Sequence, residues 1–211
     1  AVPLPLPFPA YTGGEDGRLT ISFVAPREHW LSLVLNLVGR RLRRELRYGR
    51  GITYDVDGSY EPITAGEAHA FLTMACLNEH SADVERALLD TLYDVALHGL
   101  TDEELATARE EFDRADDDPD AVYADLDNRT RNELVGFRNV ERAELAAELA
   151  ALGPARTAEV MGAALETAIL LLPPGMAPSR EAFRLYPMAS EQVAVGRTHR
   201  AAVSYAVLSL R

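Results

Sequence analysis

The segment Cys76-Leu77-Asn78-Glu79-His80 contains residue types that occur in zinc sites. Thiolate and imidazole groups bind zinc, and a neighbouring glutamate can act as the general base for a zinc-bound water. Ligands four residues apart converge on one metal ion when both lie on the same face of a helix. Cys76 instead falls in a run with strand periodicity, and Ser81 is typical of the residue that caps a following helix. We therefore expect Cys76 to be a buried thiol at a strand end, with no metal bound by this chain.

The other residues with catalytic potential form no recognisable set in the sequence. The histidines offer no pair at the spacing of two zinc ligands. An aspartate-rich run at 116–120 lacks the glycine and the terminal glutamate of an EF-hand loop, so we expect a solvated turn there. The sequence has no Gly-x-Ser-x-Gly elbow and, because it contains no lysine, no phosphate-binding Gly-Lys motif. The histidines are His29, His69, His80, His98 and His199.

Six arginines near the end of one predicted helix form the basic cluster of this sequence. They are Arg40, Arg41, Arg43, Arg44, Arg47 and Arg50. Cations at this position meet the negative end of the helix dipole. Because the six side chains would spread around several helix faces, we expect a solvated helix end rather than a coherent binding stripe.

Hydrophobic periodicity predicts the elements that must position these side chains. The predicted strands are 19–24, 52–57, 68–77 and 167–172, of which the second and third form an antiparallel hairpin. Four predicted helices span 28–47, 81–98, 121–135 and 141–152, and Ser81 is the expected N-cap of the second. Two more begin at the capping box Thr101-Asp102-Glu103-Glu104 and at Pro154. This order predicts an α+β fold, in which helices pack on one face of a mostly antiparallel sheet.

Composition limits the classes of partner. The chain has 211 residues and a formal net charge of −12, with 21 basic residues that are all arginine. An acidic chain without lysine is a poor candidate for binding nucleic acid or anionic membranes, so we expect neither. A single cysteine cannot form an intrachain disulfide, and no apolar run reaches the roughly 18 residues of a spanning helix. We expect a cytoplasmic protein.

The segment Leu46-Arg47-Tyr48-Gly49-Arg50-Gly51-Ile52-Thr53-Tyr54 resembles a signature of the M16 zinc metallopeptidases (insulinase, pitrilysin and mitochondrial processing peptidase). The signature is a leucine-arginine pair, a variable stretch, and a glycine followed two residues later by a tyrosine, in the C-terminal half-domain. A proline-rich linker, the strand and helix before the motif, the segment Gly99–Leu105 and the closing Leu170-Leu171-Leu172-Pro173 follow the family order. The resemblance covers residues 3–175 and implies the LuxS/MPP-like half-domain fold.

In that family two halves close into a clamshell, and one half carries the inverted zinc motif His-x-x-Glu-His. The other half lacks zinc and supplies an arginine and a tyrosine. The resemblance therefore implies that Arg47 and Tyr54 bind the carbonyl groups of a peptide and help to stabilise the oxyanion, a task that suits a permanent cation and a phenol donor. It also implies that zinc belongs to the partner half. The simpler interpretation is that Arg47 caps a helix and Tyr54 packs in a hairpin.

These observations divide the chain into a proline-rich linker at 1–17, an M16 C-terminal-like domain at 18–175 and an extension at 176–211. We predict the non-catalytic, substrate-binding half of an M16-like zinc metallopeptidase, active in peptide hydrolysis with a zinc-bearing half on another chain or upstream in the same gene product. A dimer is compatible with this interpretation. One alternative is a non-proteolytic M16-like binding or assembly module. A third hypothesis, which we disfavour, is a self-sufficient zinc hydrolase built on Cys76, Glu79 and His80.

Overall fold

The computed structural model describes residues 9–13, 17–114 and 121–176, and these contain a five-stranded sheet. The strand order is β1-β5-β2-β4-β3, with β1 parallel to β5 and the other neighbours antiparallel. The strands are β1 (Ala10–Gly13), β2 (Arg18–Pro26), β3 (Thr53–Pro62), β4 (Glu67–Cys76) and β5 (Ile169–Leu172). The sheet is mostly antiparallel, as predicted.

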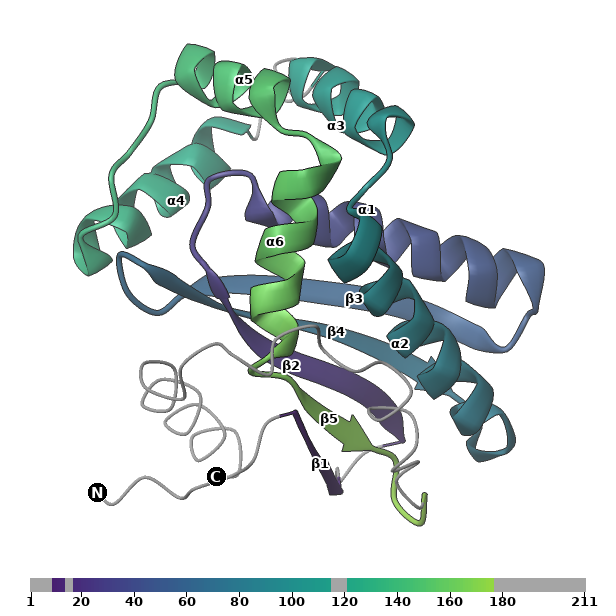
Figure 1. Ribbon diagram of the computed structural model, residues 1–211. Helices are drawn as coiled ribbons and strands as arrows, with labels where there is room; N and C mark the ends of the chain where they lie inside the picture. The colour runs from purple at the N-terminus through teal and green to yellow at the C-terminus, as the bar shows by residue number, and fades with distance from the viewer. Residues whose placement is uncertain (1–8, 14–16, 115–120, 177–211) are drawn as a thin grey trace, which may run out of the picture.

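The helices lie on one side of this sheet, with α1, α2 and α6 against it (Figure 1). The α-helices are α1 (Leu31–Arg43), α2 (Ser81–His98), α3 (Asp102–Arg114), α4 (Ala121–Val135), α5 (Arg142–Ala151) and α6 (Pro154–Leu165). A π-helix, η1 (Arg44–Gly49), extends α1, and a 3-10 turn, η2 (Asn78–His80), precedes α2. This arrangement confirms the predicted α+β fold class. In the described ranges, no helix combines the length and the hydropathy that crossing a membrane requires.

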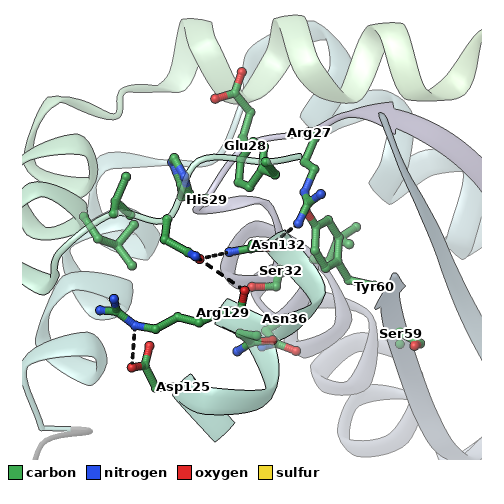
Figure 2. Close-up of a pocket in the computed structure, with 17 residues that line it drawn as sticks. Arg27, Glu28, His29, Ser32, Asn36, Ser59, Tyr60, Asp125, Arg129 and Asn132 are labelled. Carbon is green, nitrogen blue, oxygen red and sulfur yellow. Dashed lines mark hydrogen bonds and ion pairs between the residues drawn. The ribbon is translucent and has the colours of Figure 1, made fainter. Parts of the chain in front are cut away.

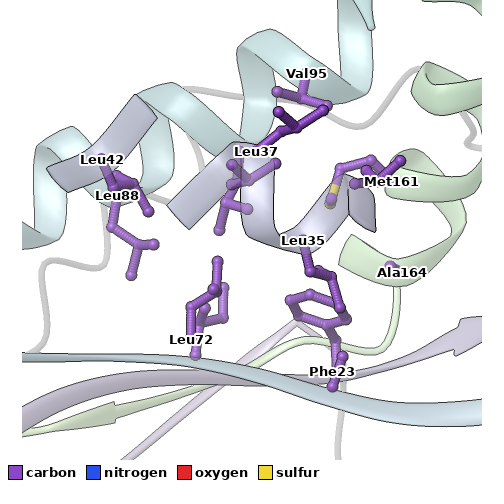
Figure 3. Close-up of a cluster of buried hydrophobic side chains, with 14 of the residues drawn as sticks. Phe23, Leu35, Leu37, Leu42, Leu72, Leu88, Val95, Met161 and Ala164 are labelled. Atoms are coloured by element: carbon purple, nitrogen blue, oxygen red, sulfur yellow. The ribbon is translucent and has the colours of Figure 1, made fainter. Parts of the chain in front are cut away.

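The core forms where the period-two face of the sheet meets the helix stripes. Alternate residues of β2 and β4 are buried, including Phe23 and Leu72. They pack beneath α1 and α6, which contribute Leu35 and Met161 among others (Figure 3). Both strands therefore follow the alternation of a half-buried sheet.

Several predicted helix boundaries are confirmed by their capping contacts. The side chain of Glu104 accepts a hydrogen bond from the Thr101 amide at 2.9 Å, and the Thr101 hydroxyl accepts one from the Glu104 amide at 3.2 Å. Pro154 is the first residue of α6, where its missing N–H costs nothing. Gly99 ends α2 with φ of +79°, and a Cβ atom there would lie 2.0 Å from the carbonyl oxygen of Pro154.

Other boundaries differ from the prediction. Ser81 is the first residue of α2 and not its N-cap, because its hydroxyl donates to the carbonyl of Asn78 at 2.6 Å. The predicted helix 28–47 is divided between α1 and the π-helix. Residues 10–13, inside the predicted linker 1–17, form β1, since the backbone groups along one side of β5 pair with them.

Some predictions concern residues outside the described part of the chain. They are the start of the proline-rich linker, the acidic turn at 116–120, and the extension beyond residue 176.

Candidate functional site

The arginine-tyrosine segment lies where α1 passes through η1 into β3, at the right-hand end of the sheet in Figure 1. Leu46 is fully buried and anchors this connection in the core. The amide of Ile52 donates to the Leu46 carbonyl at 3.0 Å, and the amide of Arg50 donates to the Glu45 carbonyl at 3.1 Å. Short π-helical turns occur frequently at functional sites. This one holds Arg47 on an exposed, well-anchored turn.

Arg47 is exposed, and its guanidinium forms no hydrogen bond or ion pair with another described residue. The guanidinium makes a cation–π interaction with the ring of Tyr48, whose centroid lies 5.6 Å from the guanidinium carbon. Tyr48 is itself 73% exposed. Among the described residues, no contact between the Arg47 guanidinium and a helix carbonyl supports the capping interpretation.

Most neighbouring arginines are committed to internal contacts. Arg41 binds Glu104 with Nε–Oε1 and Nη2–Oε2 distances of 2.8 and 2.5 Å, and it also reaches Asp94 at 2.6 Å. Burial pushes the pKa of Glu104 upward, but the hydrogen bonds from Arg41 and Thr101 outweigh this and lower it. The remaining paired arginines are Arg40 with Glu111, Arg43 with the carbonyl of Val56, and Arg50 with Glu45.

Arg44 is the second exposed arginine of this cluster with no hydrogen bond or ion pair to the described residues. The sequence named it only as one of six. Its availability depends on which carboxylates lie nearby in the fold, and residue spacing carries no signal for that.

Tyr54 occupies a β-bulge at the beginning of β3. Thr53 pairs with Cys76 and Asp55 pairs with Ala75, so Tyr54 is the extra residue between two successive pairs. The buried Thr53 fixes this point, because its hydroxyl donates to the Ala75 carbonyl at 2.5 Å. Bulges redirect side chains and are enriched next to active sites.

The backbone brings the Arg47 turn and the Tyr54 bulge to the same end of the edge strand β3. The Tyr54 side chain is outside the described part of the structure, so its placement beside Arg47 stays a prediction.

The Cys76 segment does not form the helix that convergent ligands need. Cys76 is the last residue of β4, and burial raises the pKa of its thiol. Glu79 and His80 lie in the 3-10 turn, where Nε2 of His80 is 3.6 Å from Oε1 of Glu79. Within residues 9–13, 17–114 and 121–176, no three histidine, cysteine, aspartate or glutamate side chains gather into a metal-binding group. These side chains do not fit a zinc ion.

Comparison with known proteins gives a family match for part of this chain. Residues 17–112 match the model of the Peptidase M16 inactive domain, a range that includes both Arg47 and Tyr54. No curated protein matches the chain.

Three solved structures share the fold. The first half of the periplasmic protease PqqL from Escherichia coli is 15% identical with a TM-score of 0.60, over 88% of this chain and 47% of that one. A predicted insulinase family protease from Yersinia pestis is 12% identical with a TM-score of 0.58, and the match covers 87% of this chain and 45% of that one. A peptidase M16 inactive domain from Pseudomonas fluorescens is 14% identical with a TM-score of 0.59, and the match covers 80% of this chain and 44% of that one.

This chain therefore spans less than half the length of each of these structures. At such low identities the likeness concerns the fold, which is that of M16 protease halves. Residues 17–112 thus match the peptidase M16 inactive domain, and the described residues share the fold of M16 protease halves.

Proposed function

We propose that this chain is the non-catalytic, substrate-binding half of an M16-like zinc metallopeptidase and hydrolyses peptides only together with a zinc-bearing half. The family match and the fold support an M16 half. The observation that carries the assignment of the site is Arg47, an exposed guanidinium on an anchored turn next to the Tyr54 bulge, with no hydrogen bond or ion pair to a described residue. The zinc-bearing half is on another chain or upstream in the same gene product.

The proposed chemistry divides between the two halves. Zinc in the partner half would supply the activated water that attacks the peptide carbonyl. In this chain the Arg47 guanidinium would bind a peptide carbonyl and remain charged throughout, and the Tyr54 hydroxyl would donate a directional hydrogen bond to the developing negative charge. Neither role requires a metal ligand from this chain.

The edge position of β3 supports peptide binding at this site. In the described sheet β3 pairs only with β4, so its other side carries backbone donors and acceptors without a strand partner. An extended peptide can add to such an edge as a further strand, which aligns its carbonyl groups along the sheet. A peptide bound there would pass the Tyr54 bulge and the Arg47 turn.

The test is reconstitution with a zinc-bearing half encoded upstream or in an adjacent reading frame. We expect chelator-sensitive peptidase activity only when both halves are present. Arg47→Ala and Tyr54→Phe should each lower kcat/KM about 100-fold, the effect of losing an oxyanion-type donor. Assembly of the halves, measured by analytical ultracentrifugation, should not change.

Arg50→Ala is the matched control, because Arg50 is exposed in the same connection but binds Glu45 at 2.6 Å. It should retain activity within about twofold, as exposed ion pairs contribute little. If activity reconstitutes but neither Arg47→Ala nor Tyr54→Phe slows it, the site assignment is wrong.

The edge strand also favours a second candidate, a non-proteolytic binding or assembly module. Strand addition at β3 would hold a peptide or partner subunit without any chemistry. Persistent peptide binding with no activity in the presence of any zinc-bearing half would select this candidate.

For both candidate functions the proposed location is the cytoplasm, which cell fractionation tests directly.

A further inference from the structure

A pocket of about 460 Å³ lies at the opposite end of α1 from Arg47 (Figure 2). The connection between β2 and α1, strand β3, helix α4 and the segment after α4 line it. Its polar side chains include Arg27, Ser32, Asn36, Tyr60 and Asn132. Since α1 has 13 residues, about 20 Å of helix separates this pocket from the Arg47 turn.

Arg27 is the unusual member of this lining, because it is a buried cation without a carboxylate partner. Its residue is 8% exposed. Nη1 donates to the carbonyl of Thr64 at 3.0 Å and Nη2 donates to Oδ1 of Asn132, which are both neutral acceptors. Nε is buried and has no hydrogen-bond partner. The ring of Phe137 covers the flat face of the guanidinium at 3.9 Å, and the buried Nε–H has no acceptor among the described residues.

The carboxylates around the pocket already have other cationic or donor partners. They are Glu28 with Arg156 at 2.5 Å, Asp125 with Arg129 at 2.8 Å, and Glu148 with Nδ1 of His29 at 3.0 Å. No ion pair to Arg27 occurs in the part of the chain that the structure describes. A buried charge without a partner is strongly destabilising. Arg27 is therefore a pocket cation without an ion-pair partner among the described residues, although Arg129 and Arg156 are each shared between two carboxylates.

The beginning of α1 adds to this positive potential. Its first turn contains no acidic residue, and no side chain caps it. Ser32 and Asn36 extend from these turns into the lining. Burial raises the pKa of Tyr60, and the Arg27 guanidinium offsets part of that rise. The phenol therefore remains a hydrogen-bond donor at neutral pH.

We propose that this pocket binds a carboxylate group, with Arg27 as its charge partner through Nε–H and with polar groups of Tyr60, Ser32 and Asn36 around it. One negative charge balances the one unpaired cation, and the planar carboxylate matches the edge of a guanidinium. The carboxylate belongs either to a free organic acid or to the C-terminus of a peptide. The pocket is remote from Arg47, so this inference does not depend on the proposed peptidase role.

The experiment observes the Arg27 Nε–H group in the full chain by ¹H–¹⁵N NMR, with the resonance assigned by its loss in Arg27→Gln. The probes are acetate, N-acetylalanine, N-acetylalanine amide and inorganic phosphate. We expect acids to shift this resonance and the amide to leave it unchanged. Binding of both acids identifies a free-acid site, and binding of N-acetylalanine alone identifies a chain-end site.

Two variants measure the contributions of the lining by calorimetry. Arg27→Gln should weaken binding of the acid at least 10-fold. Tyr60→Phe, which leaves the contacts of Arg27 to Thr64 and Asn132 in place, should weaken it about threefold. Arg114→Gln is the control, because Arg114 pairs with Glu110 on the surface of α3 and should not affect binding.

The proposal fails if acids leave the Arg27 resonance unmoved, if the amide binds as well as the acid, or if phosphate binds and the acids do not. It also fails if folded Arg27→Gln binds the acid with the affinity of the unmodified chain. Should Arg27→Gln not fold, calorimetric binding of the acids against the amide by the unmodified chain and the Tyr60→Phe affinity still decide the question.

Discussion

At the scale of single residues, the contacts of each arginine separate structural cations from available ones. Arg41 binds two carboxylates, and Arg43 binds a strand carbonyl. Arg44 and Arg47 lie on the same helical segment but form no hydrogen bond or ion pair with another described residue. Arg27 is a third kind, a buried cation held by neutral acceptors. The residue type alone does not distinguish these roles, because all three kinds are arginines in a lysine-free chain.

Glu85 gives a prediction at this scale. This glutamate of α2 is 2% exposed, its Oε1 atom has no hydrogen-bond partner, and burial raises its pKa to about 7. The pKa of this carboxyl is about 4.5 in the unfolded chain and about 7 in the folded one, so between these pH values the folded state binds more protons. The free energy of unfolding therefore falls as pH rises through this interval. The loss should be on the order of 3 kcal/mol, at about 1.4 kcal/mol per pKa unit.

Replacement Glu85→Gln should remove this pH dependence, because the amide does not ionise. Urea unfolding at pH 5 and pH 8 measures it: the variant should gain stability relative to the unmodified chain as pH rises. Glu103→Gln, at an exposed position of α3, is the control and should retain the original slope. An unchanged slope in Glu85→Gln would show that ionisation of Glu85 does not control stability in this range.

At the scale of elements, side chains that bond to backbone groups fix the joints between helices. The hydroxyl of the fully buried Thr157 in α6 accepts from the amide of Leu100 at 2.9 Å and donates to the carbonyl of Pro154 at 2.8 Å. It thereby ties the end of α2 to the beginning of α6, where Gly99 makes its close approach.

Thr157→Val should destabilise the protein by about 1–3 kcal/mol, because the isosteric valine leaves the buried Leu100 amide without an acceptor. Thr107→Val is the matched control, since the Thr107 hydroxyl donates within an exposed part of α3. It should cost well below 1 kcal/mol. Equal losses in urea unfolding for the two variants would contradict a special role for Thr157.

Most elements were predictable because their signals are local. The alternation in β2 and β4, the capping box at Thr101 and the proline at the start of α6 each act within a few residues. The π-helix could not be predicted in this way, because spacings of three and four residues fit a continuous α-helix up to Leu46. The wider turn is part of a tertiary arrangement in which Leu46 is buried and its carbonyl receives the Ile52 amide.

At the scale of the whole molecule, two segments far apart in the sequence complete the sheet. β1 pairs in parallel with β5 over Ala10–Gly13 and Ile169–Leu172, and the Ala10 amide donates to the Ala168 carbonyl at 3.0 Å. Parallel pairing of a four-residue strand has too little hydrophobic pattern to be recognised in a proline-rich stretch.

Deletion of residues 1–13 should therefore lower the free energy of unfolding by on the order of 2 kcal/mol, through lost ladder hydrogen bonds along β5. Deletion of residues 1–8 alone leaves β1 in place and should cost less than about 0.5 kcal/mol. Thermal and urea unfolding of both shortened chains would measure the difference. If the two deletions are equivalent, the β1–β5 pair contributes nothing measurable.

The sequence by itself determined the fold class, the hairpin, most helix boundaries and the resemblance to M16 half-domains, because periodicity, capping residues and an ordered set of short motifs are local properties of a chain. It singled out Arg47 and Tyr54 by that resemblance. Tertiary structure alone decided which of the described arginines lack a hydrogen-bond or ion-pair partner. Such pairs join residues that lie far apart in the chain, such as Arg41 with Glu104 and Glu28 with Arg156. For the same reason, only the folded chain shows that Arg27 is buried beside a pocket and forms no ion pair with a described carboxylate.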